Sequence, residues 1–91
     1  MSDNYDFIMV VAEGCGHCAS AKKGLEKMIG EKFIDIMDVT KSKEALNLAK
    51  QYGINAVPTI IVKDKKTGIG EACELREDFS GVICKDKEVD F

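Results

Sequence analysis

Two cysteines, Cys15 and Cys18, are separated by two residues and follow an apolar run at residues 7–12. If this run is a buried strand and a helix begins after it, Cys15 lies at the helix N-terminus. Unpaired N–H groups and the positive end of the helix dipole at that position favour a thiolate over a thiol. Because a thiolate is the species that attacks a disulfide, the spacing predicts thiol–disulfide exchange. Cys15 is the predicted exposed nucleophile, and Cys18, on the apolar side of the helix, is the predicted buried resolving thiol.

Gly16 and His17 lie between the two cysteines. Gly16 has no side chain and is expected to leave the backbone open to a substrate chain. His17 can place a positive charge or a hydrogen-bond donor beside the Cys15 thiolate. Both residues are therefore predicted to support the reaction. His17 is predicted to stabilise the reduced form and so to make the disulfide a better oxidant.

A Cys-x-x-Cys pair is also half of a zinc site. A zinc ribbon needs a second close pair roughly 15–20 residues away. Here Cys73 lies much farther from Cys18, and ten residues separate it from Cys84. We therefore expect no metal ligands, and no cofactor, because the thiol–disulfide cycle needs none. A zinc- or cluster-binding module that uses Cys15, Cys18 and two further ligands is the alternative from another class.

Apolar periodicity predicts alternating strands and helices along the chain. The expected elements are a strand at 7–12, a helix at 15–29, a strand at 33–39, a helix from Thr40 or Ser42 to Tyr52, a strand at 59–62, a strand near 69–73 and a short helix over 75–83. The helix between the first two strands implies that they are parallel with a right-handed crossover. The order β-α-β-α-β-β-α predicts an α/β fold with a mixed four-stranded sheet and helices on both faces.

The length of 91 residues argues for one domain, 1–91, with a charged and loose tail at 85–91. The net charge of −3 gives no electrostatic reason to expect nucleic acid or an anionic membrane as a partner. No apolar run approaches the roughly 20 residues of a membrane-spanning helix, and the acidic start of the chain is unlike a signal peptide. We therefore expect a cytoplasmic protein without a membrane partner.

Two segments resemble the signatures of a known superfamily. Residues 12–18 read AEGCGHC, and residues 51–59 read QYGINAVPT. Both resemble the thioredoxin-like superfamily, and the resemblance extends from Phe7 to about Val62. Cys-Gly-His-Cys is the form found in protein disulfide isomerase domains. The chain begins directly with its central strand, and in this it is similar to glutaredoxins and small archaeal or phage redoxins.

This resemblance implies a thioredoxin-like fold and protein disulfides as substrates, with a reductase or a low-molecular-weight thiol as electron donor. It also implies a cis peptide bond between Val57 and Pro58 that faces Cys15 and Cys18. The backbone of Val57 would then pair with an extended substrate segment, as an added β-strand does. We expect a monomer, because the cysteines must stay accessible.

Some positions depart from the family pattern. Gly14 stands where thioredoxins carry a tryptophan, and Met9 stands where they carry a buried aspartate that helps to deprotonate the resolving thiol. Glu13 or a water molecule could take that role. The acidic Glu13 and the poor match of residues 68–71 to the glutathione-binding segment argue against a glutathione site. A glutathione-dependent glutaredoxin is kept as the alternative within the class, and a non-catalytic protein-binding redoxin as a third hypothesis.

Cys73 and Cys84 belong to neither motif. A disulfide between them would stabilise the fold by closing a loop of about ten residues. The reducing compartment that we expect argues against such a bond. We therefore predict two buried free thiols that pack as small hydrophobic side chains, with Cys73 in or near the last strand and Cys84 near the end of the final helix.

Overall fold

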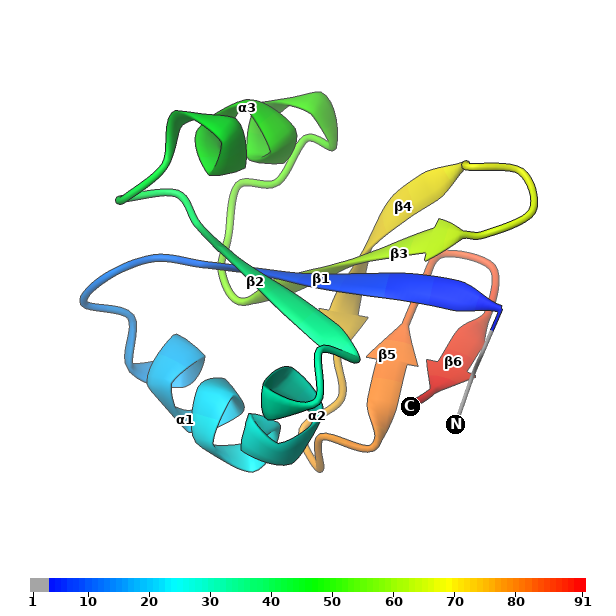
Figure 1. The fold of residues 1–91 in the computed structure, drawn as a ribbon, viewed down its shortest axis with the longest axis horizontal. Helices are drawn as coiled ribbons and strands as arrows, with labels where there is room; N and C mark the ends of the chain where they lie inside the picture. The colour runs from blue at the N-terminus through cyan, green and yellow to red at the C-terminus, as the bar shows by residue number, and fades with distance from the viewer. Residues whose placement is uncertain (1–3) are drawn as a thin grey trace.

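The computed structural model describes residues 4–91 (Figure 1). Its elements, in chain order, are β1 (Tyr5–Val11), α1 (Gly16–Gly24), α2 (Glu26–Gly30), β2 (Ile34–Asp38), α3 (Lys43–Gln51), β3 (Thr59–Asp64), β4 (Gly70–Leu75), β5 (Gly81–Ile83) and β6 (Glu88–Asp90). The strands form a six-stranded sheet in the order β2-β1-β3-β4-β5-β6. The prediction of an α/β fold with a mixed sheet is confirmed, whereas the prediction of four strands is wrong.

Residues 1–3 lie outside the described residues. The expectation that the chain has no signal peptide rests partly on these three residues. Within residues 4–91, no helix is long and apolar enough to cross a membrane.

β1 lies inside the sheet and pairs with two strands. It runs parallel to β2, with Phe7 opposite Ile34, and antiparallel to β3, with Phe7 opposite Val62. The parallel arrangement of the first two strands is as predicted, because a helical connection returns the chain to the same end of the sheet. β2 forms one edge of the sheet. Polar residues interrupt its apolar pattern, and such residues are tolerated at an edge strand because it is less covered than a central strand.

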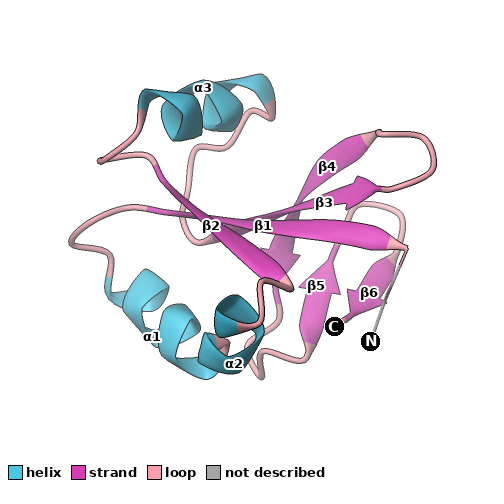
Figure 2. Ribbon diagram, viewed as in Figure 1, coloured by secondary structure: helices cyan, strands magenta, loops and turns pink. Residues whose placement is uncertain are grey.

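Successive residues of β1 point to opposite faces of the sheet and enter two separate cores. Phe7 is buried in one core together with Leu25, which follows α1. Val10 is buried in the other core together with Ala49 of α3. Figure 2 shows α1 and α2 on one side of the sheet and α3 on the other. Helices therefore cover both faces, as predicted, and this is why β1 is apolar without alternation.

The first helix is shorter than the unbroken helix predicted over 15–29. α1 ends at Gly24, Leu25 has non-helical dihedral angles (φ −111°, ψ 14°), and α2 follows as a separate turn. Gly24 lies against the aromatic ring of Phe79, and a Cβ atom at this position would overlap the ring. The glycine thus allows a distant segment of the chain to pack against the end of α1.

The helix predicted over 75–83 is wrong. β4 continues to Leu75, the chain turns, and β5 returns antiparallel beside β4. Phe79 lies in the turn and has a positive φ of 61°. Gly81 is buried, and a Cβ atom there would collide with the backbone of Val89 and Asp90 in β6. The apolar residues with helix-like spacing therefore lie on two strands and in the turn between them. Gly81 permits the close contact between β5 and β6.

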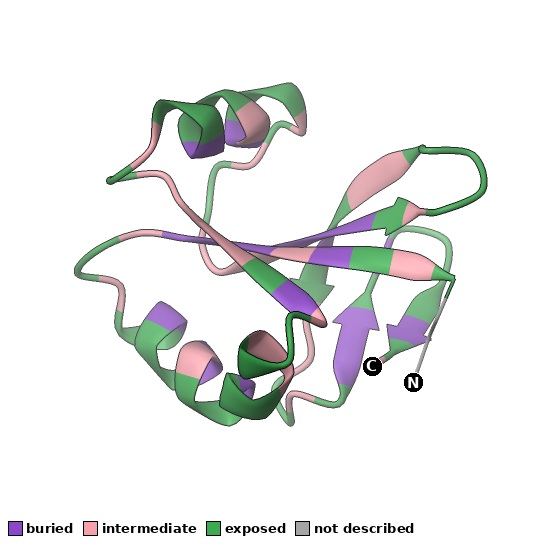
Figure 3. Ribbon diagram, in the orientation of Figure 1, coloured by how far each residue is buried: buried purple, intermediate pink, exposed green. Residues whose placement is uncertain are grey.

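Residues 85–91, which we expected to be loose, are ordered in the structure. β6 pairs with β5, and the side chain of Val89 is only 6% exposed. The ring of Phe91 packs edge-on against the ring of Phe7, with centroids 5.1 Å apart. Figure 3 shows buried positions on β5 and on β6. Two apolar side chains therefore anchor the tail to the core despite its many charged residues.

The prediction of free thiols at Cys73 and Cys84 is wrong, because a disulfide joins the two residues. In the β4–β5 ladder, Glu74 lies opposite Ile83. The disulfide therefore occupies the next cross-strand position, with its Cα atoms 4.5 Å apart. Both cysteines are buried, at 3% and 8% exposure. The cross-link ties the C-terminal strands to the middle of β4.

Candidate active site

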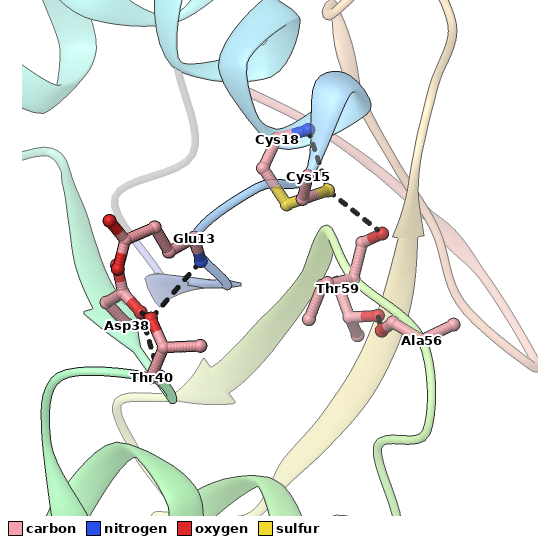
Figure 4. The surroundings of a disulfide bond; sticks show 8 residues. Glu13, Cys15, Cys18, Asp38, Thr40, Ala56 and Thr59 are labelled. Atoms are coloured by element: carbon pink, nitrogen blue, oxygen red, sulfur yellow. Dashed lines mark hydrogen bonds between the residues drawn. A yellow bond between two sulfur atoms is a disulfide. The ribbon is translucent and has the colours of Figure 1, made fainter.

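Cys15 caps the N-terminus of α1, as predicted. Gly14 turns the chain after β1 with a positive φ of 79°, and Cys15 itself has extended dihedral angles (φ −91°, ψ 110°). Its Sγ accepts a hydrogen bond from the backbone N–H of Cys18 at 3.1 Å (Figure 4). A sulfur that accepts an N–H at a helix N-terminus is stabilised as a thiolate when the disulfide is reduced.

Cys18 lies in the first turn of α1 and is joined to Cys15 by a disulfide, with Cα atoms 5.2 Å apart. Cys15 is half-buried, whereas Cys18 is 2% exposed and belongs to the core that also contains Ala21. The predicted pairing and the predicted difference in exposure are both present. Only the sulfur of Cys15 is therefore open to attack from outside.

The loop before β3 faces this pair from the other side. The Val57–Pro58 peptide bond is cis, as the family resemblance implied. The carbonyl oxygen of Val57 lies 3.7 Å from the sulfur of Cys15. The hydroxyl of Thr59 donates to the carbonyl oxygen of Ala56 at 2.7 Å and thereby closes the loop (Figure 4). Residues more than 40 positions apart in sequence are thus brought into contact at the sulfur.

The expectation that Glu13 assists Cys18 finds no support in the geometry. Met9 is fully buried, so an apolar thioether occupies the position of the family's aspartate. The Glu13 side chain is exposed and points away from the two sulfurs in Figure 4. Among residues 4–91, no charged side chain is buried.

Asp38 and Thr40 support the loop that leads to Cys15, a role that sequence analysis missed. The Thr40 hydroxyl accepts the backbone N–H of Glu13 at 3.2 Å. Asp38 accepts from the hydroxyl and the backbone N–H of Thr40 at 2.5 and 2.9 Å, and these hydrogen bonds lower the pKa of Asp38. The only sequence signal was an Asp-x-Thr at the end of a strand, which also suits a helix cap. Ser42, not Thr40, caps α3.

His17 and Gly16 are both exposed on the first turn of α1. His17 lines a surface groove together with Pro58 and with residues 74–79, which come from the end of β4 and the following turn. Sequence analysis missed this contribution because it placed residues 75–83 in a helix. The site is therefore built from three separate parts of the chain.

A second group of metal-ligating residue types lies outside this site. The ligand atoms of Glu71, Cys73 and Cys84 lie within 4.8 Å of one another. Because both sulfurs are joined in the disulfide, they are not available as thiolate ligands in this state.

The difference in exposure predicts an order of reactivity in the reduced protein. Cys15 should be alkylated by iodoacetamide well before Cys18 at neutral pH, because its thiolate is both stabilised and accessible. Peptide mass spectrometry of samples quenched at intervals measures the two rates. Equal rates at the two positions would contradict the proposed nucleophile.

Comparison with known proteins gives one family and a shared fold. The family described as "Thioredoxin domain" matches residues 7–80. A solved structure of a malarial protein is 22% identical, covers 71% of this chain and 74% of its own, and has a TM-score of 0.52. The solution structure of a thioredoxin from Thermus thermophilus is 17% identical, covers 93% of this chain and has a TM-score of 0.55. The chain spans 65% of the length of that thioredoxin.

At these identities, the two structures show the fold alone. No curated protein matches the sequence. The family match runs from Phe7 in β1 through β4, and it includes Cys15, Cys18 and the cis-proline. The observed fold agrees with it. The chain therefore belongs to the thioredoxin domain family.

Proposed function

We propose that this protein is a thiol–disulfide oxidoreductase that exchanges electrons with protein disulfides through Cys15 and Cys18. The observation that carries the proposal is the position of the Cys15 sulfur, which accepts a backbone N–H at the start of α1 and lies beside the cis Val57–Pro58 bond. A half-buried Cys15 above a buried Cys18 suits a nucleophile and its resolving partner.

The cycle starts from the reduced protein. The Cys15 thiolate attacks one sulfur of a substrate disulfide, forms a mixed disulfide with it and releases the other substrate sulfur as a thiolate, which takes up a proton. Cys18 then loses its proton and attacks the sulfur of Cys15. This step releases the second substrate thiol and leaves the Cys15–Cys18 disulfide that the structure contains. Two electrons and two protons pass to the substrate in total.

The residues around the sulfurs would position the substrate. The carbonyl oxygen of Val57 lies next to the attacking sulfur, so an extended substrate segment can pair with this stretch of backbone. Pro58 offers no N–H and lines the groove next to His17. Gly16 leaves the approach to Cys15 free of side-chain atoms.

The proposed partners are protein disulfides and an electron donor, either a reductase or a low-molecular-weight thiol. We propose that the protein acts as a monomer in the cytoplasm. The acidic Glu13 beside the site argues against an anionic tripeptide donor such as glutathione.

An insulin reduction assay with two donor systems tests the proposal. We expect turnover with NADPH and a flavin-dependent thioredoxin reductase, and little with glutathione and its reductase. Turnover with glutathione alone would establish the glutaredoxin alternative. If neither donor supports turnover, metal analysis of protein purified without chelator decides the remaining alternatives. One equivalent of zinc that is lost in Cys15→Ser would establish a metal-binding module, and its absence would establish a non-catalytic binding protein.

Replacing His17 by proline should make the protein more reducing. The change removes the imidazole, which is a donor and possible cation between the two cysteines, and it also removes the backbone N–H of residue 17. The reduced state should therefore lose stabilisation while the disulfide does not. A lost hydrogen bond of about 1 kcal/mol shifts the two-electron potential by about 20 mV to more negative values. Equilibration with glutathione redox buffers measures the potential.

His17→Ala is the matched control for this measurement. It keeps the backbone N–H and removes only the imidazole, so the difference between the two variants separates their contributions. A potential that is unchanged or more oxidising in His17→Pro would refute the role given to His17.

A further inference from the structure

A groove of about 420 Å³ lies beside the cis-proline and the first turn of α1. His17 and Ser20 line it from α1, and Pro58 lines it from the loop before β3. The remaining wall is formed by residues 74–77 and 79. We call the segment 74–79 the β4–β5 turn. Because His17 lies between the two cysteines, a substrate segment bound at Cys15 has this groove next to it.

The β4–β5 turn is held firmly in place. Phe79 packs on Gly24 at the end of α1, and Figure 1 shows the turn beside α1 and α2. The backbone N–H of Arg76 donates to the carbonyl oxygen of Gly81 at 2.9 Å and so closes the turn onto β5. The Cys73–Cys84 disulfide lies at its base. The groove is therefore a preformed surface.

The charges of this wall do not cancel. Arg76 forms ion pairs with Asp90 and, at 3.1 Å, with Glu88, and the carboxylates of Asp90 and Glu88 raise the pKa of Arg76. Its positive charge is thus matched within the protein. Glu74 and Glu77 also line the groove and are exposed, and within residues 4–91 neither forms an ion pair. The groove therefore presents two free carboxylates to a ligand.

The same wall also carries apolar side chains. Leu75 and Phe79 line the groove and are half-buried. Partly exposed apolar side chains that are rimmed by charge are typical of a surface that binds another chain. The two acidic and two apolar side chains of this groove have a natural complement, which is an apolar side chain next to a basic one.

We infer that this groove selects protein substrates in which an apolar residue and a lysine or arginine lie next to the reactive cysteine. The inference rests on the proposed function, because it assigns a substrate class to the same site. The apolar side chain would contact Leu75 and Phe79, and the basic side chain would pair with Glu74 or Glu77. The selection comes from the β4–β5 turn and leaves the chemistry of Cys15 unchanged.

Peptide substrates with one altered charge test this inference. Each peptide carries one cysteine as a mixed disulfide with 2-thiopyridine, followed by leucine and then by lysine or glutamate. Attack by Cys15 on the peptide sulfur releases pyridine-2-thione, whose absorbance gives the rate. With the reduced protein at low ionic strength, we expect the lysine peptide to react about five- to tenfold faster than the glutamate peptide. The ratio should approach one at about 1 M salt.

Two double variants locate the effect. Glu74→Gln with Glu77→Gln should bring the rate ratio of the two peptides close to one. Glu31→Gln with Glu44→Gln is the matched control. Both residues are exposed and lie outside the groove lining, and the two substitutions change the net charge by the same amount as those at Glu74 and Glu77. This control should keep the preference for lysine. Neutral 2,2′-dipyridyl disulfide should react at the same rate with the wild type and with this control variant.

The outcomes separate the inference from the proposed function. If the wild type reacts with both peptides at equal rates, the groove does not select and the inference is wrong, while the exchange activity stands. If the control variant also loses the preference, net charge and not the groove is responsible, and the inference is again wrong. If neither peptide nor dipyridyl disulfide reacts, the proposed function itself fails.

Discussion

Replacing Cys15 by serine is expected to abolish insulin reduction completely, whereas replacing Cys18 by serine should stop the reaction after its first step. The serine hydroxyl is not a thiolate at neutral pH, so the Cys15→Ser variant has no accessible nucleophile. Cys18→Ser keeps the Cys15 thiolate and its hydrogen bond from the backbone N–H of residue 18, but no thiol can resolve the mixed disulfide. Intact-mass spectrometry should show a stable substrate adduct in Cys18→Ser alone.

The other two cysteines provide the matched control. A folded Cys73→Ala/Cys84→Ala variant should retain most of the turnover, because both residues lie outside the Cys15 site. An adduct on Cys15→Ser would show that the buried Cys18 can attack substrates and would contradict the assigned roles. Loss of turnover in the folded Cys73→Ala/Cys84→Ala variant would point instead to a second redox pair that passes electrons to or from Cys15 and Cys18.

Reduction of the Cys73–Cys84 disulfide is expected to lower the free energy of unfolding by about 3 kcal/mol. The bond joins residues 11 positions apart, and releasing such a loop restores conformational entropy mainly to the unfolded chain. This loss is large compared with a total stability of about 5–15 kcal/mol. Urea unfolding in a Cys15→Ser/Cys18→Ser background, with and without a phosphine reductant, isolates the effect of this one bond.

The same background with Cys73→Ala and Cys84→Ala is the control for the reductant. Its unfolding midpoint should not change when the phosphine is added, because no disulfide is left to reduce. The parent keeps only Cys73 and Cys84, so two thiols should become available for alkylation when the reduction is complete, and the thiol count reports that point. An unchanged midpoint in the fully reduced parent would mean that β4 and the C-terminal strands are held by their packing alone.

Local sequence was enough to predict the chemistry of Cys15 and Cys18. The apolar strand, the turn at Gly14 and the start of α1 are adjacent in the chain, so their order determines where Cys15 lies relative to the helix N–H groups. The six strands and helices from β1 to β3 follow the same local rules of apolar periodicity and capping. Only the break at Gly24 departs from them, and its cause is a contact with Phe79, far away in sequence.

The C-terminal third could not be predicted by the same means. Leu75, Phe79 and Val82 recur at steps of four and three residues, which favours a helix. In the structure they lie on β4, in a turn and on β5, because tertiary pairing outweighs a weak local pattern. The burial of Val89 and Phe91 likewise depends on a core that the preceding strands create.

The sequence by itself determined a redox pair at the start of a helix that follows an apolar strand, because these residues are neighbours along the chain. Only the tertiary structure decided what surrounds that pair. It placed Val57 against the sulfur of Cys15, aligned Cys73 with Cys84 and made the β4–β5 turn one wall of the groove. Each of these contacts depends on strand register and on the packing of distant segments, and a one-residue change of register would have moved every side chain of a strand to the opposite face.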